Sequence, residues 1–84
     1  MFVIASYDIK DDRKRNKVMK RLLALGFTRL QKSVYYRRGG RGMAFDALRA
    51  VQKLLGKDDK IFIIVVSEKE FREAIRFEGM LVSS

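Results

Sequence analysis

The sequence has 84 residues, enough for a single domain over residues 1–84, and a domain of this size buries only ~60–65% of its unfolded surface. It contains neither cysteine nor histidine, which excludes disulfides, thiolate or histidine metal sites, histidine general bases and Ser-His-Asp triads. Nineteen basic against ten acidic residues give a net charge of +9, which points to a polyanionic partner. No apolar run approaches the ~20 residues that span a bilayer and no signal-peptide pattern opens the chain, so we expect a cytoplasmic protein without a membrane partner.

The first part of the chain predicts a strand and a helix. Residues 2–7 are almost continuously apolar and rich in β-branched and aromatic side chains, as expected for a buried strand. Asp11 or Asp12 can cap a helix that runs to about Leu25, and both acids suit its positive N-terminal end. Apolar residues recur along one side of this helix, basic residues cover the other, and Gly26 ends it.

The middle of the chain predicts extended structure, a loop and a second helix. Residues 27–38 read as extended, either as one long bent strand or as two short ones. Residues 37–42 combine arginine with glycine and predict a flexible basic loop. A helix follows over residues 43–55, and Gly56 ends it.

The C-terminal part predicts the strongest strand of the chain. A turn over residues 57–60 leads into residues 61–66, which are continuously apolar. Residues 68–74 favour a helical turn, and residues 75–78 favour a last short strand.

The order β-α-β(β)-α-β predicts an α+β sandwich of the ferredoxin-like βαββαβ type. We expect strands one and four to be central in its sheet. Two helices cover only one face of such a sheet, so the other face exposes apolar side chains: Phe2, Ile4, Phe62, Ile64 or their neighbours. A large apolar face on so small a domain predicts a two-fold homodimer formed through the sheet face.

Asp8 is the leading candidate for chemistry. It follows the first predicted strand directly and precedes a helix, which is where α/β folds place ligands and reactive groups. A structural role is equally well supported, since a strand-end aspartate can cap a turn or pair with an arginine. Oxygen ligands suit magnesium, manganese or calcium. In a two-fold dimer, two copies of Asp8 could meet across the axis with a divalent cation between them, which would polarise a phosphodiester and activate water.

The neighbours of Asp8 are weaker candidates. Asp11 and Asp12 could also be ligands, but helix capping explains them better. Tyr7 alternates away from Asp8 along the strand, which favours core packing, with its hydroxyl in reach of the site edge. The candidate catalytic residues are therefore Asp8 and Tyr7, with Asp8 as the metal ligand.

The positive charge lies in one continuous segment. Residues 10–41 hold twelve basic and two acidic residues, whereas the rest of the chain holds seven basic and eight acidic ones. Such a block favours binding to a nucleic-acid backbone, and a solvated face that keeps the protein soluble is the alternative. Tyr35 and Tyr36 lie within the block, and strand alternation would bury one and leave the other free to stack on bases. The candidate nucleic-acid-binding residues are Arg13, Arg15, Lys17, Arg29, Lys32, Tyr35, Arg37, Arg38 and Arg41.

Several segments resemble a known family. Residues 2–9 read Phe-Val-Ile-Ala-Ser-Tyr-Asp-Ile, and two aspartates and a basic run follow within residues 11–17. Residues 31–35 read Gln-Lys-Ser-Val-Tyr, which matches a second signature, Gln-x-Ser-Val-aromatic. Parts of residues 60–79 are similar as well. Over nearly its whole length the chain thus resembles the CRISPR-associated endoribonuclease family, the smaller of the two core CRISPR spacer-acquisition proteins.

The resemblance implies a ferredoxin-like homodimer with a magnesium or manganese ion shared between the Asp8 carboxylates of its two subunits. Family members are described as nucleases of single-stranded RNA or double-stranded DNA. They also form the central spacer that bridges two integrase dimers around incoming DNA. By position, Arg15, Lys17 and Arg29 are basic site residues, and Lys17 stands where an arginine is common. Three more residues line the neighbourhood by position: Tyr7, Tyr35 and, in a supporting place, Ser33.

The sequence leaves three functions open. The first is metal-dependent phosphodiester hydrolysis in single-stranded RNA or double-stranded DNA, within CRISPR spacer acquisition. The second is a non-catalytic clamp that holds duplex DNA by its backbone and bridges integrase dimers. The third is a toxin-type messenger-RNA nuclease of similar fold. In the resembled family the last strand often adds to the partner's sheet, and residues 75–79 could do the same. The tail beyond them is short, which leaves open whether the protein docks to the integrase.

Overall fold

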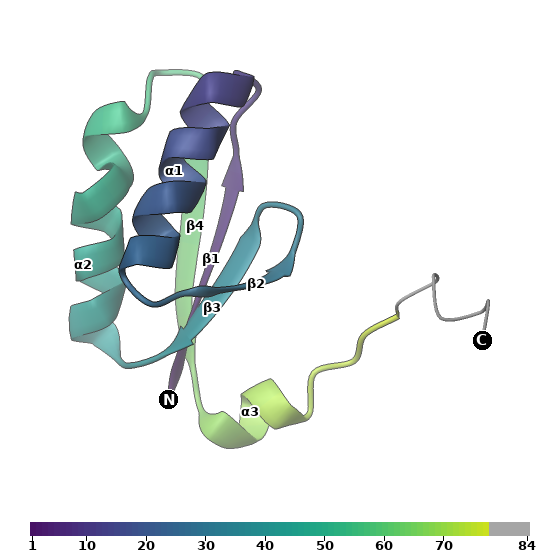
Figure 1. Cartoon of the computed structure of the whole chain (residues 1–84). Helices are drawn as coiled ribbons and strands as arrows, with labels where there is room; N and C mark the ends of the chain where they lie inside the picture. The colour runs from purple at the N-terminus through teal and green to yellow at the C-terminus, as the bar shows by residue number, and fades with distance from the viewer. Residues whose placement is uncertain (78–84) are drawn as a thin grey trace.

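A computed structural model describes residues 1–77 of the chain. Its elements, in chain order, are β1 (Phe2–Asp8), α1 (Asp12–Ala24), β2 (Thr28–Gln31), β3 (Val34–Arg38), α2 (Arg41–Val51), the 3-10 helix η1 (Gln52–Leu54), β4 (Lys60–Val66) and α3 (Glu68–Arg72). The four strands form one sheet, and α1 and α2 lie on the same side of it (Figure 1). The predicted ferredoxin-like βαββαβ arrangement is therefore confirmed.

The strand order in the sheet is β2-β3-β1-β4, and all neighbouring strands are antiparallel. The central strands are therefore β1 and β3, and the prediction that strand four is central was wrong. The cause is the tight hairpin of β2 and β3, which occupies one side of β1 and leaves β4 the other side. As an edge strand, β4 presents one row of backbone N–H and C=O groups that no strand of residues 1–77 pairs.

The first helix begins and ends as the sequence predicts. Asp11 is its N-cap, and its side chain accepts a hydrogen bond from the Lys14 backbone N–H at 2.8 Å. Val18 and Leu22, one turn apart, are fully buried. Beyond the helix Gly26 has a φ of +92°, which side-chain-bearing residues rarely adopt. Local sequence signals therefore fix α1, whose N-terminus lies next to the end of β1.

The segment of residues 27–38 forms two strands, which resolves the alternative that the sequence left open. A tight turn joins β2 to β3, and in it Ser33 has a φ of +64°. The pairing of the two strands is irregular between Arg29 and Gln31. This hairpin lies beside the end of β1, where the Tyr7 backbone N–H donates to the Ser33 carbonyl at 3.1 Å.

The predicted flexible loop over residues 37–42 was wrong. Arg37 and Arg38 belong to β3, because β1 pairs with β3 as far as Phe2 opposite Arg38. Only the two glycines that follow connect the strand to α2, which starts at Arg41 rather than at residue 43. The second helix also changes to a 3-10 helix in its last turn. Strand pairing therefore overrides the loop-like composition.

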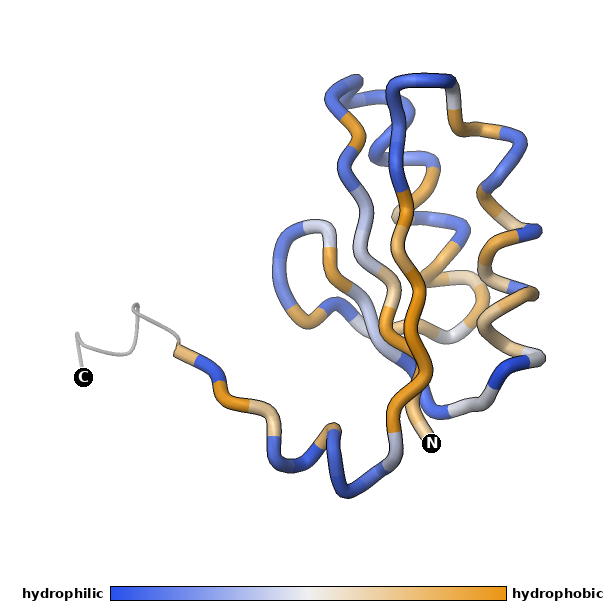
Figure 2. Tube along the Cα trace, turned by 180° about the vertical axis from the view of Figure 1, so that it is seen from behind, coloured by the Kyte–Doolittle hydropathy of each residue, from blue (hydrophilic) through white to orange (hydrophobic). Residues whose placement is uncertain are grey.

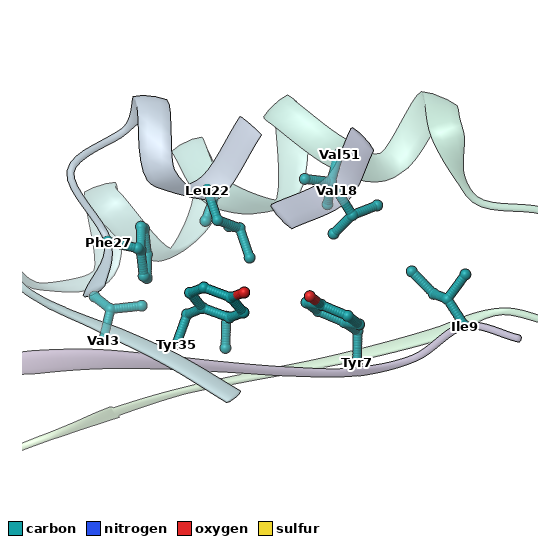
Figure 3. Close-up of a cluster of buried hydrophobic side chains, with 10 residues drawn as sticks. Val3, Tyr7, Ile9, Val18, Leu22, Phe27, Tyr35 and Val51 are labelled. Atoms are coloured by element: carbon teal, nitrogen blue, oxygen red, sulfur yellow. The ribbon is translucent and has the colours of Figure 1, made fainter. Parts of the chain in front are cut away.

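The core lies between the sheet and the helices α1 and α2. Along β1, Val3, Ala5 and Tyr7 point toward the helices and are buried. Figure 3 shows the rings of Tyr7 and Tyr35 side by side between the sheet and the helices, with Leu22 above Tyr35 and Val18 above Tyr7. This layer holds β1 in place, and β1 carries the candidate site at its C-terminal end.

The opposite face of the sheet has no helical layer, and we call it the open face. Strand alternation and register place on it these side chains: Phe2, Ile4, Ser6, Asp8, Val34, Tyr36, Arg38, Lys60, Phe62, Ile64 and Val66. Phe62 is 63% exposed and Ile64 is 41% exposed. Seen from this side, β4 is a long hydrophobic stretch with nothing in front of it (Figure 2). The predicted uncovered apolar face is therefore confirmed.

The last helix covers one end of the open face. Ser67 caps α3 in a capping box, and Phe71 stacks on Phe2 with ring centroids 4.3 Å apart. The strand predicted over residues 75–78 is absent from residues 75–77, which pair with none of the four strands that the structure describes. The remaining residue of that prediction, Glu78, lies outside the described part of the chain.

Candidate metal and nucleic-acid site

Asp8 is the last residue of β1, and its side chain is exposed on the open face. Tyr7 points the other way, into the core. Within residues 1–77, the Asp8 carboxylate takes part in no hydrogen bond or ion pair, so neither a turn cap nor an arginine pair explains it. A free carboxylate at the end of a rigid central strand is available to bind a ligand.

A single chain offers one free carboxylate for a metal ion at this place. Asp11 caps α1, as the sequence indicated, and Asp12 pairs with Arg15. Across residues 1–77 no three Asp or Glu side chains come close enough to share an ion. Magnesium usually takes one or two carboxylates together with waters and phosphate oxygens, so Asp8 fits such an ion as a partial ligand set.

Positive side chains lie on both sides of Asp8. Lys60 is its register partner on β4. On the other side is a hollow of about 330 Å³, the Asp8 hollow, whose lining includes Lys10, Arg15 and Lys32. The guanidinium of Arg15 is held in place by the Ile9 carbonyl, to which it donates at 2.9 Å. The site can therefore attract a phosphate close to the carboxylate.

Tyr7 is a neutral phenol in this structure. Burial, together with a hydrogen bond to Tyr35, raises the pKa of Tyr7 to about 12, although the positive charges of Arg15 and Arg29 oppose the shift. At neutral pH the side chain therefore keeps its proton and can act as a hydrogen-bond donor, not as a general base.

Tyr35 is the buried member of the tyrosine pair, with 2% of its surface exposed. Its ring stacks on Tyr7 at a centroid distance of 6.0 Å, so it does not offer a face to a base. Tyr35 is therefore the one of the two tyrosines that strand alternation buries. Tyr36 is the half-buried neighbour on the open face, where it contacts Phe2 and Phe71.

A second hollow, the recess, lies between α1 and the β2–β3 hairpin and has a volume of about 200 Å³. It brings together six of the predicted site residues, from β1, α1 and the β2–β3 hairpin, with Asn16 and Met19 of α1 between them. Its lining residues are Tyr7, Arg15, Asn16, Met19, Arg29, Lys32, Ser33 and Tyr35. None of them carries a carboxylate.

Three of the predicted nucleic-acid-binding arginines have structural contacts instead. Arg37 donates to the Leu25 carbonyl at 2.5 Å, which ties β3 to the end of α1. Arg38 pairs with Glu68 at 3.0 Å, and Arg41 covers an aromatic ring of its own helix. They lie at the end of the sheet opposite Asp8, so the structure does not bring them to the site.

Two predicted residues, Arg13 and Lys17, are exposed on α1 without a hydrogen bond or ion pair to the rest of residues 1–77. Lys10 and Lys60 are site neighbours that the sequence did not single out. Lys60 could have been found only from the register of β1 and β4, since its position along the chain carries no signal.

The fold and the site together define a small ferredoxin-like protein with a free carboxylate at the end of a central strand and basic side chains around it. Residues 1–74 match the family model described as CRISPR associated protein Cas2. The chain belongs to the Cas2 family.

Named relatives agree with this assignment. The chain is 45% identical over 83 residues to the CRISPR-associated endoribonuclease Cas2 of Aeropyrum pernix, a match covering 96% of this chain and 89% of the relative. It is 34% identical over 79 residues to the protein of the same name in Thermofilum pendens, covering 94% and 85%. The crystal structure of Streptococcus pyogenes Cas2 at pH 6.5 has the same fold, with a TM-score of 0.74, 18% identity and coverage of 93% and 100%.

No helix within residues 1–77 combines the length and the apolar content needed to cross a bilayer.

Proposed function

We propose that the protein is a metal-dependent endonuclease that cleaves single-stranded RNA as a homodimer, with one magnesium or manganese ion between the Asp8 carboxylates of the two subunits. One observation carries the proposal: Asp8 lies on the same face of the sheet as the uncovered apolar side chains. A two-fold dimer through this face, with its axis near the end of the sheet that carries Asp8, brings two free carboxylates together. The names of the relatives, endoribonucleases, favour RNA as the substrate.

The open face supports a dimer because α3 covers only one end of it and leaves Phe62 and Ile64 exposed. Phe62 and Ile64 lie on β4, on the same face as Asp8, so packing of two such faces would bury them. The edge of β4 supports a second contact. Ile75 and Phe77 are 99% and 87% exposed, and the partner's copies of these residues could pair along β4.

The chemistry follows from the residues around Asp8. A divalent cation supplies charge stabilisation and an activated water to phosphodiester hydrolysis. Lys10, Arg15 and Lys60 would hold the phosphate beside the carboxylate, and Arg15 is already positioned by its backbone contact. Tyr7 would support the site from the core, since its raised pKa keeps it protonated and excludes it as a general base.

A clamp that binds duplex DNA without cutting it is the second candidate, and a specific observation favours it. Arg13 and Lys17 are exposed on α1 with no partner among residues 1–77, so they are free to contact a backbone. In CRISPR spacer acquisition, such a dimer would bridge the integrase around incoming DNA. Membership of the Cas2 family favours these CRISPR roles over a toxin.

The experiment compares wild type, Asp8→Asn and Asp46→Asn on labelled single-stranded RNA and duplex DNA, with magnesium, manganese or chelator. Asp46 is a matched control, since it is an exposed carboxylate on α2 that pairs with Arg49. We expect cleavage of RNA by wild type and Asp46→Asn, only with metal, and none by Asp8→Asn. Equal cleavage by Asp8→Asn would refute the metal site. Salt-sensitive binding of duplex DNA by all three proteins without cleavage would establish the clamp instead.

A further inference from the structure

The recess between α1 and the β2–β3 hairpin is lined by hydrogen-bond donors. Arg15, Arg29 and Lys32 bring three positive charges to it, and no lining residue is acidic. Arg15 is held by the Ile9 carbonyl and by its ion pair with Asp12, so its guanidinium is positioned before any ligand arrives. Positioned arginines are the side chains best suited to bind phosphate.

The tyrosine pair adds a donor at the floor of the recess. Tyr7 and Tyr35 both line the recess, and their rings stack with centroids 6.0 Å apart. A tyrosine hydroxyl proton can rotate toward a ligand, and the Tyr35 hydroxyl has no hydrogen-bond partner other than Tyr7 within residues 1–77. Because Tyr35 lines the recess while its ring is buried, it offers this proton, not a stacking surface.

The size of the recess suits a phosphate. Its volume is about 200 Å³, against a share of ~30 Å³ for each molecule of liquid water, so it has room for a phosphate group with several waters. It also adjoins the Asp8 hollow, because both are lined by Tyr7, Arg15, Lys32 and Ser33. A nucleic-acid strand at Asp8 could therefore continue into it.

We propose that the recess is a metal-independent subsite for a phosphate of the nucleic-acid strand, adjacent along the strand to the phosphate at Asp8. The placement relative to Asp8 rests on the proposed function, but the binding of phosphate by Arg29 and Tyr35 does not. The subsite gives Tyr35 a role as a hydrogen-bond donor to phosphate. It also explains why two buried tyrosines line the recess together with three basic side chains.

The test is an NMR titration, in chelator, of two pentauridylates that differ only in carrying a 5′-phosphate or a 5′-hydroxyl. The variants are Arg29→Gln and Tyr35→Phe, and the matched controls are Arg49→Gln on α2 and Tyr36→Phe, the neighbour that points to the open face. Loss of one charge-assisted hydrogen bond should weaken binding by about tenfold or more in Arg29→Gln, and loss of one neutral bond by about threefold to tenfold in Tyr35→Phe. The controls should stay within about twofold.

The 5′ end identifies the source of the phosphate. Tighter binding of the 5′-phosphorylated strand, lost in Arg29→Gln, would place a terminal phosphate in the recess, and equal binding of both strands would place an internal one there. Arg29→Gln and Tyr35→Phe binding as well as their controls would overturn the proposal. If wild type shows no cleavage while these variants still lose affinity, the subsite stands and the proposed nuclease fails.

Discussion

The dimer through the open face can be tested by truncating Phe62 to alanine. A buried phenylalanine covers roughly 150–250 Å², and 63% of Phe62 is exposed, so a dimer could bury about 130 Å² more of each copy. At about 25 cal/mol per Å² this burial amounts to about 3 kcal/mol per subunit and about 6 kcal/mol per dimer as an upper bound. Because buried area converts only partly into affinity, we expect the dissociation constant of the dimer to rise at least about 100-fold.

The assay is sedimentation velocity over a range of protein concentrations. Leu23→Ala is the control, since Leu23 is 45% exposed on α1, in the helical layer away from the open face. The fold of the monomer should be unaffected in both variants, because each side chain is largely exposed. The reasoning is refuted if Phe62→Ala dissociates no more readily than Leu23→Ala, or if wild type is a monomer at micromolar concentration.

Three further predictions concern the stability of the fold. Leu22 is fully buried, so Leu22→Ala should lower the free energy of unfolding by about 3 kcal/mol and Tm by more than about 10 °C. The exposed neighbour is the control, and Leu23→Ala should change the free energy of unfolding by less than about 0.5 kcal/mol. Thermal unfolding measures both variants. Asp11→Ala removes the N-cap of α1 and should cost about 1 kcal/mol in urea unfolding. The hydrogen bond with Lys14 lowers the pKa of Asp59. This pair should therefore stabilise the protein above about pH 4 and lose its contribution as the pH falls further. Asp59→Asn should remove that part of the pH dependence of Tm.

Local signals in the sequence predict the frame of the site. The apolar run before Asp8 and the cap at Asp11 place the carboxylate between β1 and α1, as the structure confirms. Uncovered apolar side chains also follow from two helices on one sheet, and Phe62 is among them. These features depend on residues that are close in sequence, or on the number of helices and strands, so they can be predicted from one amino-acid sequence.

Features that depend on strand pairing could not be predicted. The edge position of β4 and the register that sets Lys60 opposite Asp8 arise from contacts between distant segments. Arg37 and Arg38 read as part of a glycine-rich loop, but pairing with β1 extends β3 through them. Alternation predicts that one of two adjacent tyrosines is buried without saying which.

Mixing of subunits tests the shared site most directly. Wild type and Asp8→Asn are combined in equal amounts, allowed to exchange, and assayed for metal-dependent cleavage of single-stranded RNA. If each site needs the Asp8 carboxylates of both subunits, only dimers of two wild-type chains are active, and activity should fall to about one quarter of that of wild type at the same total concentration. Activity of about one half would show that each subunit cleaves with its own Asp8, and would contradict a metal ion shared across the dimer.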